Sequence, residues 1–329
     1  MALVIRNAIL HVLRNDGRES VFSSQELDFD SEICEAFIMK HVKKLMNNPG
    51  VRTANFTAGT PMYDLLNRYQ KGEVYFKDMS EAVASKMDEI MARFTSIPPC
   101  DLLITKVGHK SGEYLAILKL NYQEVYASKS KDADNQLTLC AALPFSSGKV
   151  EYAALIALDG PAMPISLVEK PAEIDGNMVL YFSEFFLECE TSPSRKEQVQ
   201  LIDEVTTEFV DEHFKRDPVV SARIKTALVD EAEAEEGFVS IDNVAAAAFS
   251  GDEEVKQQYI GILREAGVQA DMPLGERVVK QQFATHKIKA ENGIELKFPA
   301  QLAADDDELE IVKHGDGTVT ITLKHLRMV

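Results

Sequence analysis

The stretch DLLITKVGHKSGEYLAILKLNY, residues 101–122, decides the fold class of this 329-residue chain. Its two apolar runs, 101–107 and 114–120, have the length of strands, and His109-Lys110-Ser111-Gly112 between them is typical of a β-hairpin turn. We therefore predict an antiparallel sheet built around this hairpin. Further strand candidates follow it: LTLCAAL at 137–143, YAALIAL at 152–158 and MVLYF at 178–182.

Helical periodicity precedes the hairpin. Asp30 and Ser31 can cap a helix from about 31 to 46, and further helices are expected at 60–70 and from Asp78 or Ser80 to Pro98-Pro99. The apolar face of the first helix holds Ile33, Phe37, Ile38, Val42 and Leu45. Together with the strands, these helices predict an α+β domain over residues 1–190, an antiparallel sheet with helices on one side.

The second half of the chain changes character twice. Residues 195–267 are helical in pattern, with Asp217-Pro218 opening the second helix and Ser240 capping a short Ala-rich one. Residues 275–324 are β in pattern, with one hairpin turning at Asn292-Gly293 and a second near Asp316-Gly317, joined by the acidic segment AADDDE. We expect residues 191–329 to form a second region, an acidic helical part followed by a small C-terminal β-hairpin part.

The charge of the chain is strongly negative and uneven. The formal net charge is −18, and residues 190–260 alone hold 17 acidic and 7 basic residues. A field of that sign repels nucleic acid and anionic membranes and favours a basic protein partner. No run approaches the ~20 apolar residues of a membrane span. With 4 cysteines far apart, expected as buried free thiols, the composition predicts a soluble intracellular protein with no membrane partner.

Two segments oppose this acidity. We call KHVKKLMNNPGVR, 40–52, the first basic island and RVVKQQFATHKIK, 277–289, the second; each holds four Lys or Arg, one His and no acid. Such islands either bind phosphate or serve a helix end or a solvated strand face. Four phosphate contacts would give a salt slope of about −3.6 on duplex DNA. The candidate nucleic-acid-binding residues are Lys40, Lys43, Lys44, Arg52, Arg277, Lys280, Lys287 and Lys289.

Local motifs for catalysis are absent from the sequence. FSSGKV, at 145–150, lacks the glycine and the Ser or Thr of a phosphate-binding loop, and none of the seven His forms a metal-ligand motif. We therefore predict no metal, no cofactor and no enzymatic activity. A site assembled from residues that are distant in sequence stays open as the alternative.

Several segments, taken in order, resemble the bacterial nucleoid-associated protein family often called NdpA. They are ILHVL (9–13), SSQELDF (23–29), DLLITKVGHKSGEYLAILKLNY (101–122), FFLECETSPSRKEQVQLIDEVTTEF (185–209), GIELKFPAQL (293–302) and LEIVKHGDGTVTITL (309–323). The resemblance implies a protein of the cytoplasm, found with the nucleoid, with no established enzymatic role. It supplies no set of site residues.

The resulting hypothesis is a nucleoid-associated, non-enzymatic binding protein. It would act by weak, non-specific DNA contact through the basic islands, or by docking its acidic 190–260 block onto proteins already bound to DNA. Two alternatives come from other classes: a nucleic-acid- or nucleotide-processing enzyme, and a soluble protein–protein adaptor. The sequence leaves open whether the chain forms a homo-oligomer.

Overall fold

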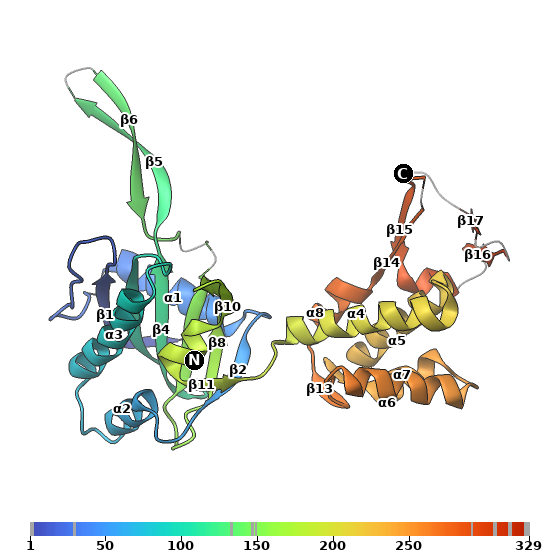
Figure 1. Ribbon diagram of the computed structural model, residues 1–329, viewed down its shortest axis with the longest axis horizontal. Helices are drawn as coiled ribbons and strands as arrows, with labels where there is room; N and C mark the ends of the chain where they lie inside the picture. Colours follow the sequence, from blue (N-terminus) through green and yellow to red (C-terminus); the bar gives the residue numbers. More distant parts are fainter. Residues whose placement is uncertain are drawn as a thin grey trace. The chain divides into compact units, whose positions relative to one another are not determined.

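The computed structural model describes residues 3–28, 31–131, 134–145, 148, 150–290, 292–304, 308–314 and 318–325. The chain divides into two compact units, Met1–Ser192 and Pro193–Val329 (Figure 1). The first unit is built on one large sheet, and the second on helices followed by hairpins. The fold is α+β, as the sequence predicts.

The first unit contains a seven-stranded sheet in the order β1-β3-β4-β7-β8-β2-β11, and every neighbouring pair is antiparallel. The predicted central hairpin is confirmed, with Cys100 opposite Asn121 and His109 opposite Gly112. The strands are β1 (Val4–Leu13), β2 (Arg52–Phe56), β3 (Cys100–His109), β4 (Gly112–Asn121), β7 (Tyr152–Ala157), β8 (Ile165–Val168) and β11 (Cys189–Thr191).

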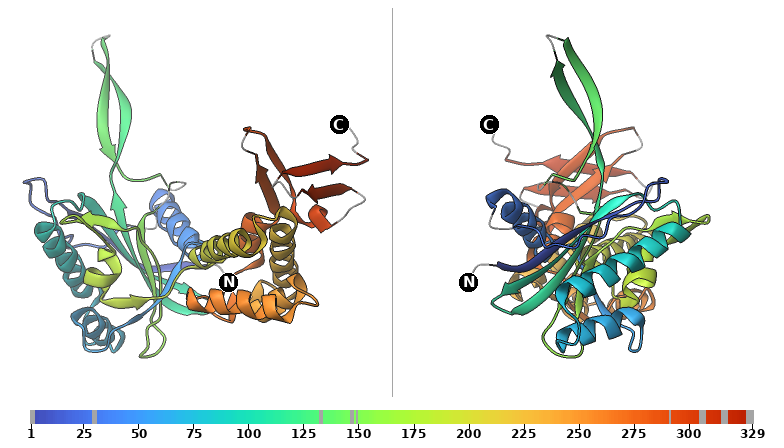
Figure 2. Two further views of the ribbon diagram at one scale, coloured as in Figure 1. Left: turned by 45° about the vertical axis from the view of Figure 1, so that its right-hand side comes forward. Right: turned by 90° about the vertical axis from the view of Figure 1, so that its left-hand side faces the viewer.

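Helices cover both faces of this sheet, so the prediction of helices on one side was wrong (Figure 2). Helix α1 (Glu32–Met46) packs on the face that holds Leu103 and Val107. The opposite face, with Leu102 and Ile104, packs against α2 (Pro61–Gln70), α3 (Phe76–Arg93) and the short π-helix η1 (Phe182–Leu187). The reason is visible in β3 and β4, which are apolar on both sides, as strands buried on both faces are.

The observed helix boundaries differ in detail from the predicted ones. Helix α1 begins after Ser31, whose side chain makes no capping hydrogen bond, and Asp30 lies outside the described residues. Ile33 is 84% exposed and not part of the apolar face, whereas His41 is buried there. Helix α3 begins at Phe76, because the buried Phe76 and Met79 extend its apolar stripe toward the N-terminus.

Two of the strand candidates have a different setting from the expected one. MVLYF is not a single strand: β10 (Asn177–Val179) pairs with β9 (Ala172–Ile174), and Phe182 already belongs to η1. LTLCAAL lies in β6 (Asp134–Ala142), which pairs only with β5 (Gln123–Lys131) in a separate two-stranded sheet. Strand β5 was not predicted, because QEVYASKSK is too polar to stand out as a strand.

All four cysteines are free, but only Cys100 and Cys189 are buried; Cys34 and Cys140 are half-buried. Burial raises the pKa of the Cys100 thiol to about 11 and that of Cys189 to about 12, so both stay protonated at neutral pH. The expectation of buried thiols therefore holds for two of the four.

The second unit carries the predicted helices α4 (Arg195–Phe214), α5 (Pro218–Ala234), α6 (Ile241–Ala248) and α7 (Glu253–Glu265). Helix α8 (Glu276–Phe283) corrects the prediction, because it lies within residues 275–324, which were expected to be β. Local capping explains where two of them begin. Ser194 and Glu197 form a capping box at α4, and the Asp217 carboxylate accepts from the Val219 and Val220 amides ahead of Pro218. Ser240 occupies the N-cap position of α6 but makes no side-chain cap. No described helix is both long and apolar enough to cross a membrane.

The hairpins that end the second unit are also confirmed. Strand β14 (Thr285–Lys289) pairs with β15 (Glu295–Pro299), and β16 (Leu309–Lys313) pairs with β17 (Val319–Leu323). A 3-10 helix, η2 (Ala300–Ala304), follows β15, and β12 (Phe238–Ser240) pairs with β13 (Asp271–Pro273). Residues 305–307 of the acidic segment and Asp316-Gly317 of the second turn lie outside the described residues.

Candidate nucleic-acid interface

The first basic island begins on the solvent side of α1. Acids occupy its first turn and Lys43 and Lys44 its last turn, the arrangement that complements the helix dipole. Lys40, Lys43 and Lys44 are exposed, while the neighbouring Val42 and Leu45 face the sheet. The helix-end interpretation of these lysines therefore has structural support, and it is compatible with contact to an external phosphate.

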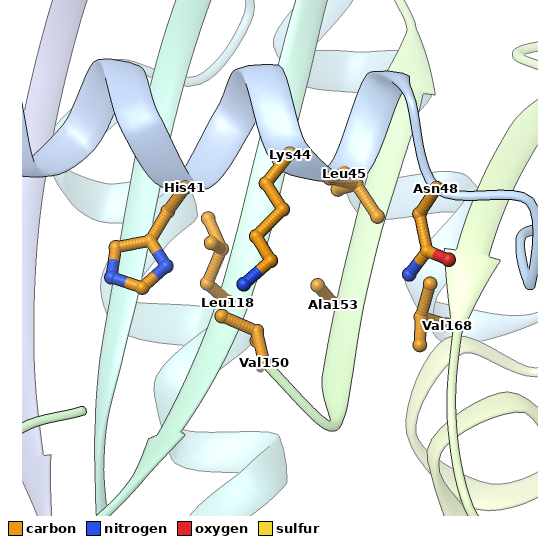
Figure 3. Close-up of a pocket in the computed structure, with 8 residues that line it drawn as sticks. All are labelled: His41, Lys44, Leu45, Asn48, Leu118, Val150, Ala153 and Val168. Atoms are coloured by element: carbon orange, nitrogen blue, oxygen red, sulfur yellow. The ribbon is translucent and has the colours of Figure 1, made fainter. Parts of the chain in front are cut away.

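A small cavity lies under the same end of α1 (Figure 3). His41, Lys44 and Asn48 project from the helix side toward a sheet side that includes Leu118 and Val150. The cavity measures about 20 Å³, room for about one water molecule. The Lys44 ammonium group donates a hydrogen bond to the Gly148 carbonyl, which ties it to the chain beside the cavity.

His41 does not add a positive charge to this island. Its ring is 1% exposed, and neither ring nitrogen has a hydrogen-bond partner among the described residues. Burial lowers the pKa of His41, and the nearby Lys44 lowers it further, so the ring is neutral at neutral pH. The island therefore offers lysines but no imidazolium.

Arg52, the last member of the first island, is held inside the unit. It lies on β2, its side chain is 20% exposed, and its Nη1 lies 3.9 Å from Oε1 of the fully buried Glu169. Burial raises the pKa of Glu169, while an amide hydrogen bond from Ser183 and the charge of Arg52 oppose that rise. Arg52 thus serves to balance a buried carboxylate, and little of it is available to a phosphate.

The second island spans α8 and β14. On α8, Arg277 is exposed, but Lys280 lies between two carboxylates, 2.7 Å from Glu233 and 2.6 Å from Glu276. These hydrogen bonds, with Glu233 the larger contributor, raise the pKa of Lys280. Phe283, at the end of α8, is fully buried in the core of the unit and is not available to stack on a base.

On β14 the side chains alternate between two faces, as expected for a strand with one solvated face. Lys287 and Lys289 are exposed on one face, and His286 and Ile288 pack on the other. Both lysines face a single acid across the hairpin: Lys287 Nζ lies 2.7 Å and Lys289 Nζ 3.8 Å from the Glu295 carboxylate. Half of the second island's formal charge is therefore shared with one acid.

Sequence reasoning missed Lys297, which pairs opposite Lys287 on the exposed face of β15. The turn signal would not have found it: a two-residue turn at Asn292-Gly293 places residue 298 across from residue 287, whereas the observed register differs by one residue and places residue 297 there. The two islands lie in different compact units, the first in Met1–Ser192 and the second in Pro193–Val329. Neither unit holds both.

An acidic stripe runs along α4, within the acidic block. Glu204, Glu208 and Glu212 are exposed and follow one another at intervals of four residues, so they share one face of the helix. We call these three residues the α4 stripe. None of the three side chains has an ion pair or hydrogen bond with another described residue, unlike Asp203, which lies 3.1 Å from Lys225. Like charges at this spacing destabilise a helix by about 0.2–0.5 kcal/mol per pair.

In the part of the chain that the structure describes, no cluster of three or more His, Cys, Asp or Glu side chains is placed to bind a metal ion. The buried histidines have other surroundings. His11 accepts from the Ser23 amide and lies 3.3 Å from the Ser80 hydroxyl, and burial lowers its pKa to about 4.

Comparison with known proteins adds what the geometry does not supply. No curated protein matches the chain. The model of one protein family, described as nucleoid-associated protein YejK, matches residues 9–328, which is nearly the whole chain. The resemblance inferred from the dispersed segments is thereby confirmed. The chain belongs to the family of the nucleoid-associated protein YejK, which places it with the nucleoid in the bacterial cytoplasm.

Proposed function

We propose that this nucleoid-associated protein is a non-enzymatic binding protein that docks, through the acidic face of its second unit, onto basic proteins already bound to DNA. The observation that supports docking is the uneven neutralisation of charge. Arg52, Lys280, Lys287 and Lys289 each face a carboxylate, whereas the α4 stripe faces no cation among the described residues. Among the described residues of the second unit, the α4 stripe is thus a group of three acids that no cation neutralises.

The field around the chain favours the same partner. A net charge of −18 slows the approach of a polyanion and speeds that of a cationic protein, most strongly at low ionic strength. Three parallel glutamates on one helix face would match a cluster of Lys or Arg side chains. Binding of such a cluster would relieve the repulsion among the three glutamates.

Direct DNA contact is the second candidate, and the first island supports it. Lys40 and Lys43 are exposed on neighbouring turns of α1, and neither has an ion pair with a described residue. Two phosphate contacts correspond to a salt slope of about −1.8 on duplex DNA, a weak and non-specific interaction. The enzyme and the adaptor stay as alternative hypotheses. Crosslinking in cells tests the adaptor hypothesis: if neither DNA nor nucleoid proteins are recovered with the protein, the adaptor is favoured.

A mobility-shift experiment separates docking from direct contact. The full chain is added at low salt to bare duplex DNA and to the same duplex coated with a basic DNA-binding protein. Docking predicts a further shift of the coated duplex only, and loss of that shift in Glu204→Gln/Glu208→Gln/Glu212→Gln. A shift of bare DNA of equal strength would instead support direct contact.

The matched control changes the same number of charges elsewhere in the second unit. Glu236→Gln/Glu254→Gln/Glu265→Gln removes three exposed acids outside the α4 stripe. Docking through the stripe requires that this variant still shift the coated duplex. Equal loss in both triple variants would mean that only total charge matters, and the stripe would then have no special role.

A further inference from the structure

Lys119 is a buried lysine near one end of the central hairpin. It lies on β4, opposite Leu102 on β3 and Tyr152 on β7. It is 1% exposed, and it is the only buried Lys or Arg in the part of the chain that the structure describes. A buried ammonium group is stable only where other groups replace its lost hydration and balance its charge.

The partners of Lys119 replace its hydration but do not balance its charge. The ammonium donates to the Pro98 carbonyl, at 3.2 Å, and to the side-chain oxygen of Asn121. The Cys100 thiol, a weak acceptor, also lies beside it, and the centroid of the Tyr152 ring is 5.5 Å away. All of these groups are neutral, and Lys119 forms no ion pair with a described residue. Burial lowers the pKa of Lys119 as a result.

A cleft opens beside this lysine, where β4 continues into β5 (Figure 1). Its volume is about 190 Å³, against about 20 Å³ for the cavity under α1. This is room for roughly six water molecules or for one small organic molecule. Lys119, Asn121 and Gln123, at alternate positions along the chain, line the cleft together with Glu151, which directly precedes β7.

The polar groups of the lining favour an anion. The oxygen of the Asn121 amide accepts from Lys119, whereas its nitrogen donates to no described residue. The Gln123 side chain is exposed and has no hydrogen-bond partner among the described residues. Glu151, the one acid among the described lining residues, is already paired with Lys170. The cleft therefore offers one unbalanced cation and amide groups that are able to donate.

A single cation matches a ligand with a single negative charge. Phosphate sites use Arg forks, several cations or the amides of a helix N-terminus, and none of these is among the described residues that line the cleft. A carboxylate has one negative charge and two oxygens, and each oxygen accepts hydrogen bonds. An ammonium group and an amide nitrogen supply donors to both oxygens.

We propose that this cleft binds a small organic carboxylate. One carboxylate oxygen replaces the Cys100 thiol as a partner of the Lys119 ammonium, and the Asn121 amide donates to the other oxygen. The bound negative charge stabilises the protonated form of Lys119 inside the protein. This ligand site is separate from the proposed docking surface, because the cleft lies in the first unit and the α4 stripe in the second.

Trifluoroacetate is a probe for this site that fluorine NMR detects directly. In a chloride buffer of fixed ionic strength, the full chain should broaden the trifluoroacetate signal, and acetate should restore the narrow line by competition. Inorganic phosphate at the same ionic strength should not restore it. A signal that stays narrow in the presence of the protein, or one that phosphate narrows as well as acetate does, would overturn the proposal.

Two lysines of the central hairpin provide a matched comparison. Lys119→Met removes the buried cation and should abolish the broadening, whereas Lys110→Met, at the exposed turn, should keep it. Equal loss in both variants would mean that the ligand responds to net charge and not to the cleft, which would overturn the site.

A third variant guards against a Lys119→Met chain that fails to fold. Gln123→Phe changes an exposed residue, keeps the buried cation and narrows the cleft, so it should also abolish the broadening. Broadening that persists in Gln123→Phe, or in a Lys119→Met chain with the far-ultraviolet circular dichroism of the parent protein, would contradict binding in this cleft.

Discussion

Lys287 and Glu295 lie on paired strands of one hairpin, with 2.7 Å between Lys287 Nζ and Glu295 Oε2. The other oxygen of the same carboxylate lies 3.8 Å from Lys289 Nζ. A single acid therefore holds two of the four cations of the second island. An incoming phosphate would have to displace a carboxylate that is already in place, which is why charge counted along the sequence overstates what this island can bind.

Removing that carboxylate should strengthen DNA binding. Glu295→Gln keeps the side-chain shape and releases Lys287 and Lys289, with Lys297 beside them. We expect tighter binding of a labelled duplex at low salt, measured by fluorescence anisotropy. Glu310→Gln, which removes the partner of Lys324 in the other hairpin, is the control with the same charge change. Equal gains in both variants would show that net charge alone acts and that the β14–β15 face is not used.

The first island makes the opposite prediction. If direct contact occurs there, Lys40→Gln/Lys43→Gln should make the slope of log affinity against log salt shallower by about 1.8, the value for two phosphate contacts. Lys71→Gln/Lys77→Gln removes two exposed lysines elsewhere in the same unit and should leave the slope unchanged. A slope that changes equally in the two variants would exclude α1 as a DNA-contacting surface.

Stability should fall in mild acid because of His286. Burial lowers the pKa of His286 from 6.5 to about 4. The charge of Lys225 lowers this pKa slightly further, and the charge of Asp203 opposes the decrease. The folded state then binds fewer protons than the unfolded state between these values, so the free energy of unfolding decreases as the pH falls from about 6.5 to 4. The full effect is about 3 kcal/mol.

Urea unfolding at pH 7 and pH 5 checks this assignment. His286→Phe should reduce the loss of stability between the two pH values, because a phenyl ring cannot take up the proton. His11, in the other unit, has its pKa lowered to about 4 by burial and should contribute a separate share that this variant leaves intact. An unchanged pH dependence in His286→Phe would mean that His286 already has a normal pKa in the folded chain.

Much of the fold could be predicted because its signals are local. The pair of apolar runs around Gly112 predicts the central hairpin, and Asp217-Pro218 marks the start of α5 by capping and by the fixed φ of proline. Helices on the second face of the sheet were missed for a different reason. Which face a helix covers depends on packing between distant segments, and only the apolar character of both sides of β3 hinted at it.

The candidate interface shows where such reasoning ends. Glu295 is close to Lys287 in sequence, but the observed register differs by one residue from that of a two-residue turn at Asn292-Gly293, so the turn alone does not predict this pairing. The pairing of Lys280 with Glu233 and that of Arg52 with Glu169 join residues far apart in the chain, and no local pattern predicts them. Basic islands are visible in a sequence, whereas the acids that neutralise them are found only in the folded structure.

The α4 stripe leads to a prediction in which stability and binding change in opposite directions. Glu208 has a like charge four residues away on each side, Glu204 and Glu212. Glu208→Lys converts two repulsions into two attractions and should stabilise the protein by about 1 kcal/mol, measured by urea unfolding. The same variant should lose the shift of protein-coated DNA, because the stripe then carries a cation at its centre. Glu254→Lys on α7 makes the same charge change outside the stripe and should keep that shift. If Glu208→Lys is more stable but still shifts the coated duplex, the α4 stripe has no docking role. A row of acids that destabilises its own helix is most simply explained by a partner that binds those acids.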